Sequence, residues 1–194
     1  MSVTKITTAD LPGPGKPIFR FMDTVLDVGS GYAPQAYVPY RHCTCIEPHP
    51  EMFDAMRFDY GSRPERWVLY NCDWATFYPT QKPGLWTFDC VTAFDVIEHM
   101  PKDEGLRFLQ QAQSIARQQV IIHTPLGFYP QDFSNGRLLE NGIPGRDWQT
   151  HKSGWLPEDF GEDWDVLYAE NVYHNDGNGQ PGNFGLLWAF WERR

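Results

Sequence analysis

Acidic residues end three successive apolar runs of this chain, and a Gly-Ser-Gly turn follows the first of them. Asp27 lies just before the turn of residues 29–31, Glu47 lies twenty residues further on, and Asp73 closes the third run. Glycine lets a backbone come close to a ligand, and ligands of open α/β sheets bind beyond the carboxyl ends of the strands. A carboxylate at position 47 can accept hydrogen bonds from both hydroxyls of a ribose. The spacing therefore predicts a nucleoside site.

The same turn lacks the residues that hold phosphate. A dinucleotide site needs a third glycine where Pro34 stands, and no P-loop lysine follows the turn. Asp73 and Trp74 suit an adenine, whose exocyclic amine needs an acceptor and whose face needs a ring or apolar cover. The pattern thus favours adenosine without a phosphate over an NAD dehydrogenase.

Strands that alternate with helices must position these residues. Apolar runs predict strands over residues 24–28, 43–47, 67–72, 88–95 and 120–123. Helices are predicted over residues 35–40, 51–60 and 102–118. Two further strands, residues 164–173 and 184–192, are joined by the hairpin signal of residues 175–179. We expect an α/β fold: a Rossmann-like, doubly wound, mostly parallel seven-stranded sheet with a C-terminal antiparallel hairpin.

The 194 residues suit a single domain. Residues 1–20 carry Pro and Gly punctuation and are expected to form a loose leader. Residues 126–156 lack a clear period, and we expect this long insertion to form the acceptor side of the site.

Composition narrows the partners and the compartment. A net charge of -9 without a basic cluster makes nucleic acid an unlikely partner. The four cysteines form no C-x-x-C pair, which is typical of reduced core thiols. No run is long enough to insert into a membrane and no signal peptide is present, so a cytoplasmic protein is expected, as a monomer or homodimer.

Four motifs in order, between Val25 and Pro125, resemble the class I S-adenosylmethionine-dependent methyltransferases of the type 11/23-like group. They are D-V-G-x-G from Asp27, E-P from Glu47, C-D-W ending at Trp74 and F-D-V-I-E-H-M from Phe94. The resemblance implies S-adenosyl-L-methionine as cofactor and S-adenosyl-L-homocysteine as product.

The resemblance implies that each motif contacts a different part of the cofactor. Gly29, Ser30 and Gly31 pass under the methionine, Asp27 orients its amino group, and Glu47 holds the ribose. Met52, Asp73 and Trp74 surround the adenine. The remaining cofactor-binding positions are Pro48, Phe94 and Asp95. The third glycine of the family is Ala33 here, so a methyltransferase-fold module that binds the cofactor without transferase activity is the alternative.

The segment from Asp95 to His99 is the candidate catalytic region. Oxygen acceptors need a base, and we assign Glu98 and His99 as the catalytic residues and no residue to a metal. Loop packing is the other interpretation of this segment. A third follows from relatives that make ubiquinone or methylate the 2′-hydroxyl of small RNA ends, in which E-x-x-E-H binds a divalent metal; this chain has D-x-x-E-H.

The expected reaction is methylation of a small molecule or a glycan or lipid precursor, at oxygen. A metal-dependent methyltransferase of RNA 3′ ends is the rival. The segment from His151 to Phe160 resembles an H-x-S-x-W segment that folds back over the mouth of the site in one branch of these enzymes. His123 and His151 are further candidates for a ligand or a base.

Overall fold

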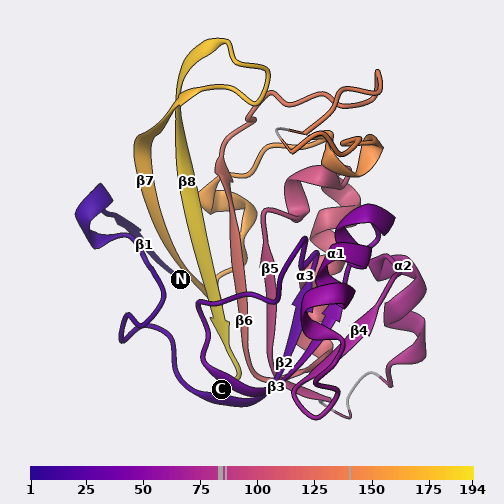
Figure 1. The fold of residues 1–194 in the computed structure, drawn as a ribbon. Helices are drawn as coiled ribbons and strands as arrows, with labels where there is room; N and C mark the ends of the chain where they lie inside the picture. Colours follow the sequence, from indigo (N-terminus) through magenta and orange to yellow (C-terminus); the bar gives the residue numbers. More distant parts are fainter. Residues whose placement is uncertain (83–84, 86, 140) are drawn as a thin grey trace. The chain divides into compact units, whose positions relative to one another are not determined.

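The computed structural model describes residues 1–82, 85, 87–139 and 141–194, which contain eight strands (Figure 1). Their bounds are β1 (Ser2–Lys5), β2 (Met22–Val28), β3 (Tyr40–Ile46), β4 (Trp67–Tyr70), β5 (Phe88–Phe94), β6 (Ala116–Leu126), β7 (Trp164–Asn175) and β8 (Pro181–Glu192). They form one sheet in the order β1-β7-β8-β6-β5-β2-β3-β4. The fold is mixed α/β with a mostly parallel sheet, and β7 and β8 form the expected C-terminal antiparallel hairpin.

In the described part of the chain, three α-helices and five short 3-10 helices connect the strands. The α-helices are α1 (Pro50–Tyr60), α2 (Trp74–Phe77) and α3 (Lys102–Ile115). The 3-10 helices are η1 (Thr8–Asp10), η2 (Tyr78–Thr80), η3 (Ile97–His99), η4 (Asp147–Gln149) and η5 (Pro157–Asp159). Pro50 begins α1, where its missing N–H costs no helical bond. Asp73 caps α2 by accepting a hydrogen bond from the Thr76 N–H at 2.8 Å.

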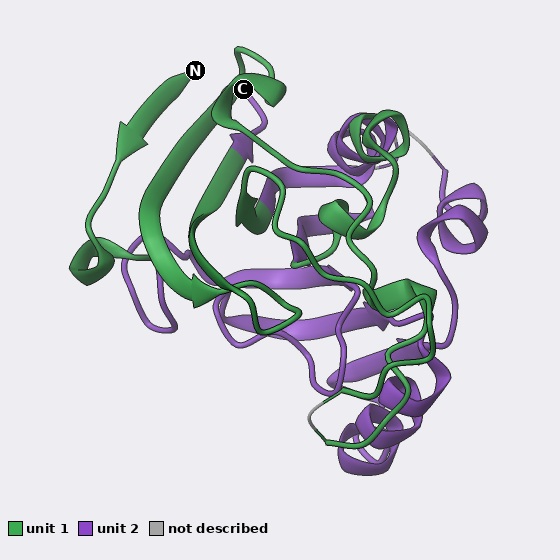
Figure 2. Ribbon diagram, turned by 90° about the horizontal axis from the view of Figure 1, so that it is seen from above, with its two compact units in different colours: residues 1–11, 95–106, 122–190 green, residues 12–94, 107–121, 191–194 purple. Residues whose placement is uncertain are grey.

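The chain forms two compact units, coloured separately in Figure 2. Unit 1 comprises residues 1–11, 95–106 and 122–190, and unit 2 comprises residues 12–94, 107–121 and 191–194. Each unit draws on three separate stretches, so neither is a continuous segment of chain.

Unit 2 holds the parallel strands on which the predicted cofactor residues lie. Strand β2 pairs with β3 and β5, and β3 pairs with β4, all in parallel. Asp27 is in register with Cys45 on one side and with Thr92 on the other. Because successive strand residues face opposite sides, Cys43 and Cys45 point to the same side of β3. The carboxyl ends of β2 and β3 lead directly into the turn at Gly29 and into Glu47.

In unit 1, two strands that lie far apart in the sequence pair with each other. Strand β1 pairs in parallel with β7, with Ser2 opposite Asp165. The Ser2 N–H and Oγ both donate to Asp165 Oδ1, at 2.9 and 2.7 Å.

Two expectations from the sequence require correction. The sheet has eight strands rather than seven, because residues 2–5, expected in a loose leader, form β1. The helix expected over residues 35–40 is absent, and the Gln35 side chain instead bonds both backbone groups of Val38. Pro39 explains this result, since it has no N–H for a helical hydrogen bond.

Three of the four cysteines are core thiols. Cys43, Cys45 and Cys90 are buried, Cys72 is half-buried, and all four are free. Among the described residues, no helix is both long and apolar enough to cross a membrane.

Candidate functional site

The turn after β2 leaves its backbone open on one side. Gly29 and Gly31 have φ values of 67° and 61°, in the left-handed region that favours glycine. A β-carbon added at Gly31 would meet no described atom within 4 Å. The Gly29 N–H donates to the Ile46 carbonyl at 2.9 Å, which fixes the turn against the end of β3. A ligand can therefore approach the backbone at Gly31 without meeting a side chain.

Glu47 holds this turn from the neighbouring strand. Its Oε2 accepts the Gly31 N–H at 2.7 Å and its Oε1 accepts the His49 N–H at 2.8 Å. Burial raises the pKa of the carboxyl group, while these two hydrogen bonds act in the opposite direction. Each oxygen has a second lone pair, so the bonds leave acceptor capacity for a ribose. That role of Glu47 remains a prediction.

Asp27 is committed to the protein itself. Its Oδ2 accepts the Gln35 N–H and its Oδ1 accepts the Thr92 hydroxyl, both at 2.9 Å. The side chain is buried, and this burial raises the pKa of Asp27 to about 6, against the effect of its hydrogen bonds. Asp27 thus fixes the chain beyond the turn to β5.

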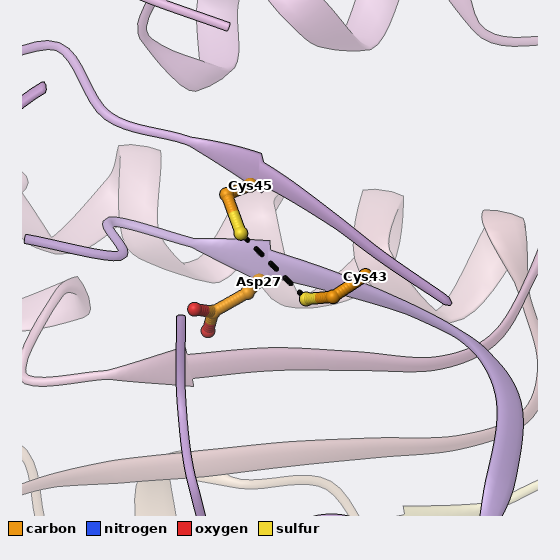
Figure 3. Close-up of side chains that lie close together, drawn as sticks. All are labelled: Asp27, Cys43 and Cys45. Atoms are coloured by element: carbon orange, nitrogen blue, oxygen red, sulfur yellow. Dashed lines mark hydrogen bonds between the residues drawn. The ribbon is translucent and has the colours of Figure 1, made fainter. Parts of the chain in front are cut away.

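Asp27 also lies beside two buried thiols, as Figure 3 shows. The Sγ atoms of Cys43 and Cys45 are 3.7 Å apart, and Asp27 lies within 4.8 Å of both. Burial raises the pKa of the Cys43 thiol well above its ordinary value. A metal prefers thiolates and a free carboxylate, whereas both oxygens of Asp27 are occupied. We therefore assign no metal to this cluster.

The predicted adenine contacts lie in the packed part of unit 2. Trp74 is buried, stacks on Tyr78, and meets the edge of Phe108 at a ring-centroid distance of 4.7 Å. Its indole N–H donates to Gln111 Oε1 at 2.6 Å. The contact of its ring with adenine stays a prediction.

Four other predicted cofactor positions also belong to unit 2. Met52 is buried on α1, and Pro48 precedes that helix. Phe94 is half-buried at the end of β5, with its ring 5.2 Å from that of Tyr37. The Ser30 hydroxyl donates to the Asp27 carbonyl at 3.0 Å, inside the turn. Their roles as cofactor contacts also stay predictions.

In unit 1, Asp95 begins the candidate catalytic segment in a strained conformation. Its φ is 55°, which is uncommon for a residue other than glycine. The Asp95 N–H donates to the His123 carbonyl at 3.0 Å, and Asp95 Oδ1 lies 2.9 Å from His123 Nδ1. Desolvation acts to raise the pKa of Asp95, but the bond to His123 and the nearby imidazoles outweigh it, so the pKa is lowered. Asp95 therefore stays ionised and paired with His123.

Glu98 has one oxygen with a partner and one without. Its Oε2 accepts the Thr124 hydroxyl at 3.0 Å, whereas Oε1 is buried with no hydrogen bond from a described residue. Burial, and then the charge of Asp95, raise the pKa of Glu98 well above its ordinary value. An unpaired buried polar atom is costly and calls for an explanation, such as an absent ion.

His99 and His151 face Glu98 with matching orientations. Their ring centroids are 4.7 Å apart. Nδ1 of His99 lies 3.2 Å from the Thr150 carbonyl, and Nδ1 of His151 lies 2.7 Å from the Tyr129 carbonyl. Because a carbonyl oxygen only accepts, both Nδ1 atoms carry the proton and both Nε2 atoms are acceptors; the Nε2 of His151 accepts the side-chain N–H of Gln131 at 3.3 Å.

The two imidazoles are neutral. Burial, together with His151, lowers the pKa of His99 to about 4, and burial lowers the pKa of His151. One ligand atom from each of Glu98, His99 and His151 lies within 4.8 Å of the others. Neutral imidazoles whose second nitrogen donates to a carbonyl are the arrangement found at metal sites. These three residues, called the Glu98 cluster below, are thus able to hold a divalent cation.

The segment from His151 to Trp155 is anchored to the Glu98 cluster. The N–H groups of Lys152 and Ser153 donate to the Glu98 carbonyl at 2.7 and 3.1 Å. The Ser153 hydroxyl donates to the Ile97 carbonyl and accepts the indole N–H of Trp155. Trp155 is fully buried. The H-x-S-x-W motif therefore sets the position of His151.

Two neighbours of the Glu98 cluster carried no sequence signal specific enough to assign. Thr124 had only its place after a strand, and its hydroxyl contacts Glu98. His123 was a candidate without a motif, and the structure pairs it with Asp95. For His151, the H-x-S-x-W motif was the usable signal.

No family model and no curated protein matches the chain. Solved structures do match. Magnesium protoporphyrin IX methyltransferase (ChlM) from Synechocystis PCC 6803, with bound SAH, matches with a TM-score of 0.52 and 15% identity, over 88% of this chain and 74% of that one. The DhpI-SAM-HEP complex gives a TM-score of 0.54 and 17% identity, over 90% and 79%. The methyltransferase domain of bacterial CtHen1 gives 0.51 and 15%, over 89% and 91%.

The chain therefore has the class I fold of S-adenosylmethionine-dependent methyltransferases. It covers 39% of the length of the cyclopropane synthase MmaA2 from Mycobacterium tuberculosis, a chain that it also matches.

Proposed function

We propose that this protein is an S-adenosylmethionine-dependent methyltransferase that acts on oxygen. The observation that carries the proposal is the turn of residues 29–31, whose open backbone is held by a buried carboxylate from the next strand. The SAH and SAM present in the matched ChlM and DhpI structures support the cofactor.

The residues of unit 2 fit this cofactor. Gly31 has open space where a side chain would stand, and the two oxygens of Glu47 retain lone pairs after binding two N–H groups. In our proposal the turn passes under the methionine and Glu47 accepts the ribose hydroxyls. When bound, S-adenosylmethionine supplies an activated methyl group.

The Glu98 cluster fits a divalent cation. Its unpaired Oε1 and two imidazole nitrogens offer one carboxyl and two neutral ligands, and a bound cation would displace a proton from Glu98 and the Gln131 amide from His151 Nε2. When bound, such a cation supplies a Lewis acid that makes a hydroxyl group more acidic. Thr124, Thr150 and Tyr129 hold the three ligands in orientation through the hydrogen bonds described above.

The proposed acceptor is a small molecule or a glycan or lipid precursor. The net charge of -9 supports an acceptor other than a long polyanion. We propose that the protein works in the cytoplasm as a monomer or homodimer. Light scattering on the purified protein would measure the oligomeric state.

Calorimetric titration with S-adenosylmethionine and S-adenosylhomocysteine tests the cofactor site. We expect both to bind, and expect Glu47→Gln to weaken binding by about tenfold or more, because charge-assisted hydrogen bonds to the ribose are lost. Glu65→Gln, at an exposed position, is the matched control and should bind normally. Absence of heat with either ligand would contradict the proposal.

A second candidate function is metal-dependent 2′-O-methylation of RNA 3′ ends. The Glu98 cluster favours it and the acidic net charge opposes it. Incubation with Mn²⁺, labelled cofactor and a short RNA separates the candidates, since only this one predicts a label that is lost when the 3′-terminal 2′-hydroxyl is absent. Cofactor binding without transfer to any hydroxyl acceptor would instead favour a binding module.

A further inference from the structure

Asp95 is paired with a third imidazole, that of His123, and not with the residues of the Glu98 cluster. In the E-x-x-E-H pattern the first acid belongs to the metal ligands, but the shorter Asp95 is not a member of the Glu98 cluster. It is paired instead with His123, on β6. Building on the proposed function, we propose that His123 is the general base that accepts the proton of the acceptor hydroxyl, and that Asp95 is its positioning residue.

The contact fixes the tautomer of His123. Asp95 Oδ1 lies 2.9 Å from Nδ1, and an ionised carboxylate only accepts hydrogen bonds. Nδ1 therefore carries the proton, and Nε2 carries the lone pair that a base needs. No described residue forms a hydrogen bond with Nε2, so this lone pair is available.

The ring of His123 is also fixed in orientation. It packs against Trp188 with a centroid distance of 4.6 Å and an interplanar angle of 49°. The Asp95 N–H donates to the backbone carbonyl of His123, so backbone and side chain hold the same pair of residues together. The left-handed φ of Asp95 is a second sign, because such strain concentrates at functional sites.

The other described histidines of unit 1 near this position have different tasks. His99 and His151 belong to the Glu98 cluster, and the Nε2 of His151 also accepts the Gln131 amide N–H at 3.3 Å. His123 lies outside that cluster, and its side chain is 12% exposed. The side chain of His123 is paired with the carboxylate of Asp95 and packs against the ring of Trp188. The imidazoles of His99 and His151 act electrostatically on Asp95. His123 is thus the imidazole left to accept a proton.

The step balances in atoms and charge. The hydroxyl proton of the acceptor passes to His123 Nε2, and the acceptor oxygen forms a bond to the methyl carbon. The bond from that carbon to the sulfonium sulfur breaks, and its electron pair stays on sulfur. The products are a methyl ether, a neutral thioether and a protonated His123, which then releases its proton to water.

Two substitutions of His123 separate a base from a structural residue. In His123→Asn the amide nitrogen replaces Nδ1 and keeps the bond to Asp95, whereas in His123→Gln it replaces Nε2 and loses that bond. We expect both to lower the rate of methyl transfer to catechol, a hydroxyl acceptor that chelates cations, by about 10²- to 10⁴-fold. Melting temperature and cofactor affinity, measured alongside, should stay near wild type in His123→Asn. Retention of wild-type rate by His123→Asn with loss in His123→Gln would overturn the proposal in favour of a structural pair.

Chemical modification decides the same point without an acceptor. Diethylpyrocarbonate acylates an unprotonated, accessible ring nitrogen. We expect it to label His123 of the full-length protein at Nε2, with exposed His174 as the reactive reference and fully buried His49 as the unreactive one. Asp95→Asn should abolish the label, because an amide donor at Nδ1 moves the proton to Nε2.

The two arms fail independently. If His123 stays as unreactive as His49, or if Asp95→Asn does not change its labelling, the proposed base is wrong even where methyl transfer occurs. If labelling behaves as expected but neither catechol nor any hydroxyl acceptor is methylated while cofactor binds, the tautomer inferred for His123 stands and the proposed transferase activity fails.

Discussion

Two groups of buried acids in this molecule differ in what occupies their oxygens. In unit 2, both oxygens of Asp27 and both of Glu47 accept hydrogen bonds from the protein. In unit 1, Glu98 leaves one oxygen without a partner among the described residues, beside the neutral imidazoles of His99 and His151. Every oxygen of the first group has a protein partner, and only the second lone pairs of Glu47 are left for the proposed ribose, whereas the second group leaves a whole oxygen without a described partner.

The difference shows why proximity of metal-binding residue types is a weak criterion. Asp27, Cys43 and Cys45 lie as close together as Glu98, His99 and His151 do. Protons distinguish them. Burial raises the pKa of the Cys43 thiol and both oxygens of Asp27 have partners, whereas the imidazoles of unit 1 are neutral and oriented by carbonyls. Four measurements, from the largest expected effect to the smallest, test this distinction.

Removal of one imidazole should produce the largest change. We expect His151→Ala to weaken Mn²⁺ binding by at least about 1,000-fold, or about 4 kcal/mol, since a ligand is lost rather than one of its supporting bonds. Titration followed by electron paramagnetic resonance measures this affinity. The matched control in unit 2, Cys43→Ser, should leave it unchanged; a weaker Mn²⁺ affinity in that control would break the comparison.

Asp27 should make stability depend on pH in an unusual direction. Its pKa in the fold is about 6, above the 3.8 of the free carboxyl, so the folded state binds the proton more tightly. This group therefore stabilises the fold most below about pH 4, and the effect is lost as pH rises through about 6. The full effect is about 3 kcal/mol.

Urea unfolding between pH 4 and 7 would measure the Asp27 effect. The difference in unfolding free energy between wild type and Asp27→Asn should shift towards wild type as the pH falls. Asp73→Asn, at the half-buried cap of α2, is the matched carboxyl-to-amide control. A shift in the opposite direction would show that Asp27 is more acidic than its burial implies.

Gly105 connects α3 to the segment that positions His151. A β-carbon there would collide with the ring of Trp155, so Gly105→Ala should cost about 1–3 kcal/mol of unfolding free energy. Gln110→Ala, on an exposed position of the same helix, should be nearly neutral. Thermal unfolding measures both, and equal stability of Gly105→Ala and wild type would mean that Trp155 can move away without cost.

The smallest effect is expected for Thr124. Thr124→Val removes the hydroxyl that donates to Glu98 Oε2 and keeps the shape of the side chain, which should cost about 1 kcal/mol of stability. Mn²⁺ affinity should fall by less than tenfold, because Glu98 itself remains. A loss as large as that of His151→Ala would place Thr124 among the essential supports of the cluster.

Periodicity and motif order predicted the α/β fold, its mostly parallel sheet and its final hairpin. They did not predict the partner of β1, because Ser2–Lys5 is exposed on every residue and carries no apolar pattern. They also overestimated a helix at residues 35–40, where Gln35 makes a local turn instead.

The motifs proposed Glu47, Glu98 and His99 as site residues, and their roles stay predictions. The positions of protons and the contacts of each residue could not be predicted, because they require coordinates. The free oxygen of Glu98 depends on Thr124, which lies 26 residues away. Likewise, Asp95, just after β5, pairs with His123 on β6, and spacing along the chain does not encode such pairs.

Strand β1 has a consequence for the order in which the chain folds. Ser2 and Asp165 are 163 residues apart, yet they lie side by side. Closing so long a loop is entropically costly and slow compared with local contacts. During synthesis, β1 therefore waits until β7 has been made before it can pair.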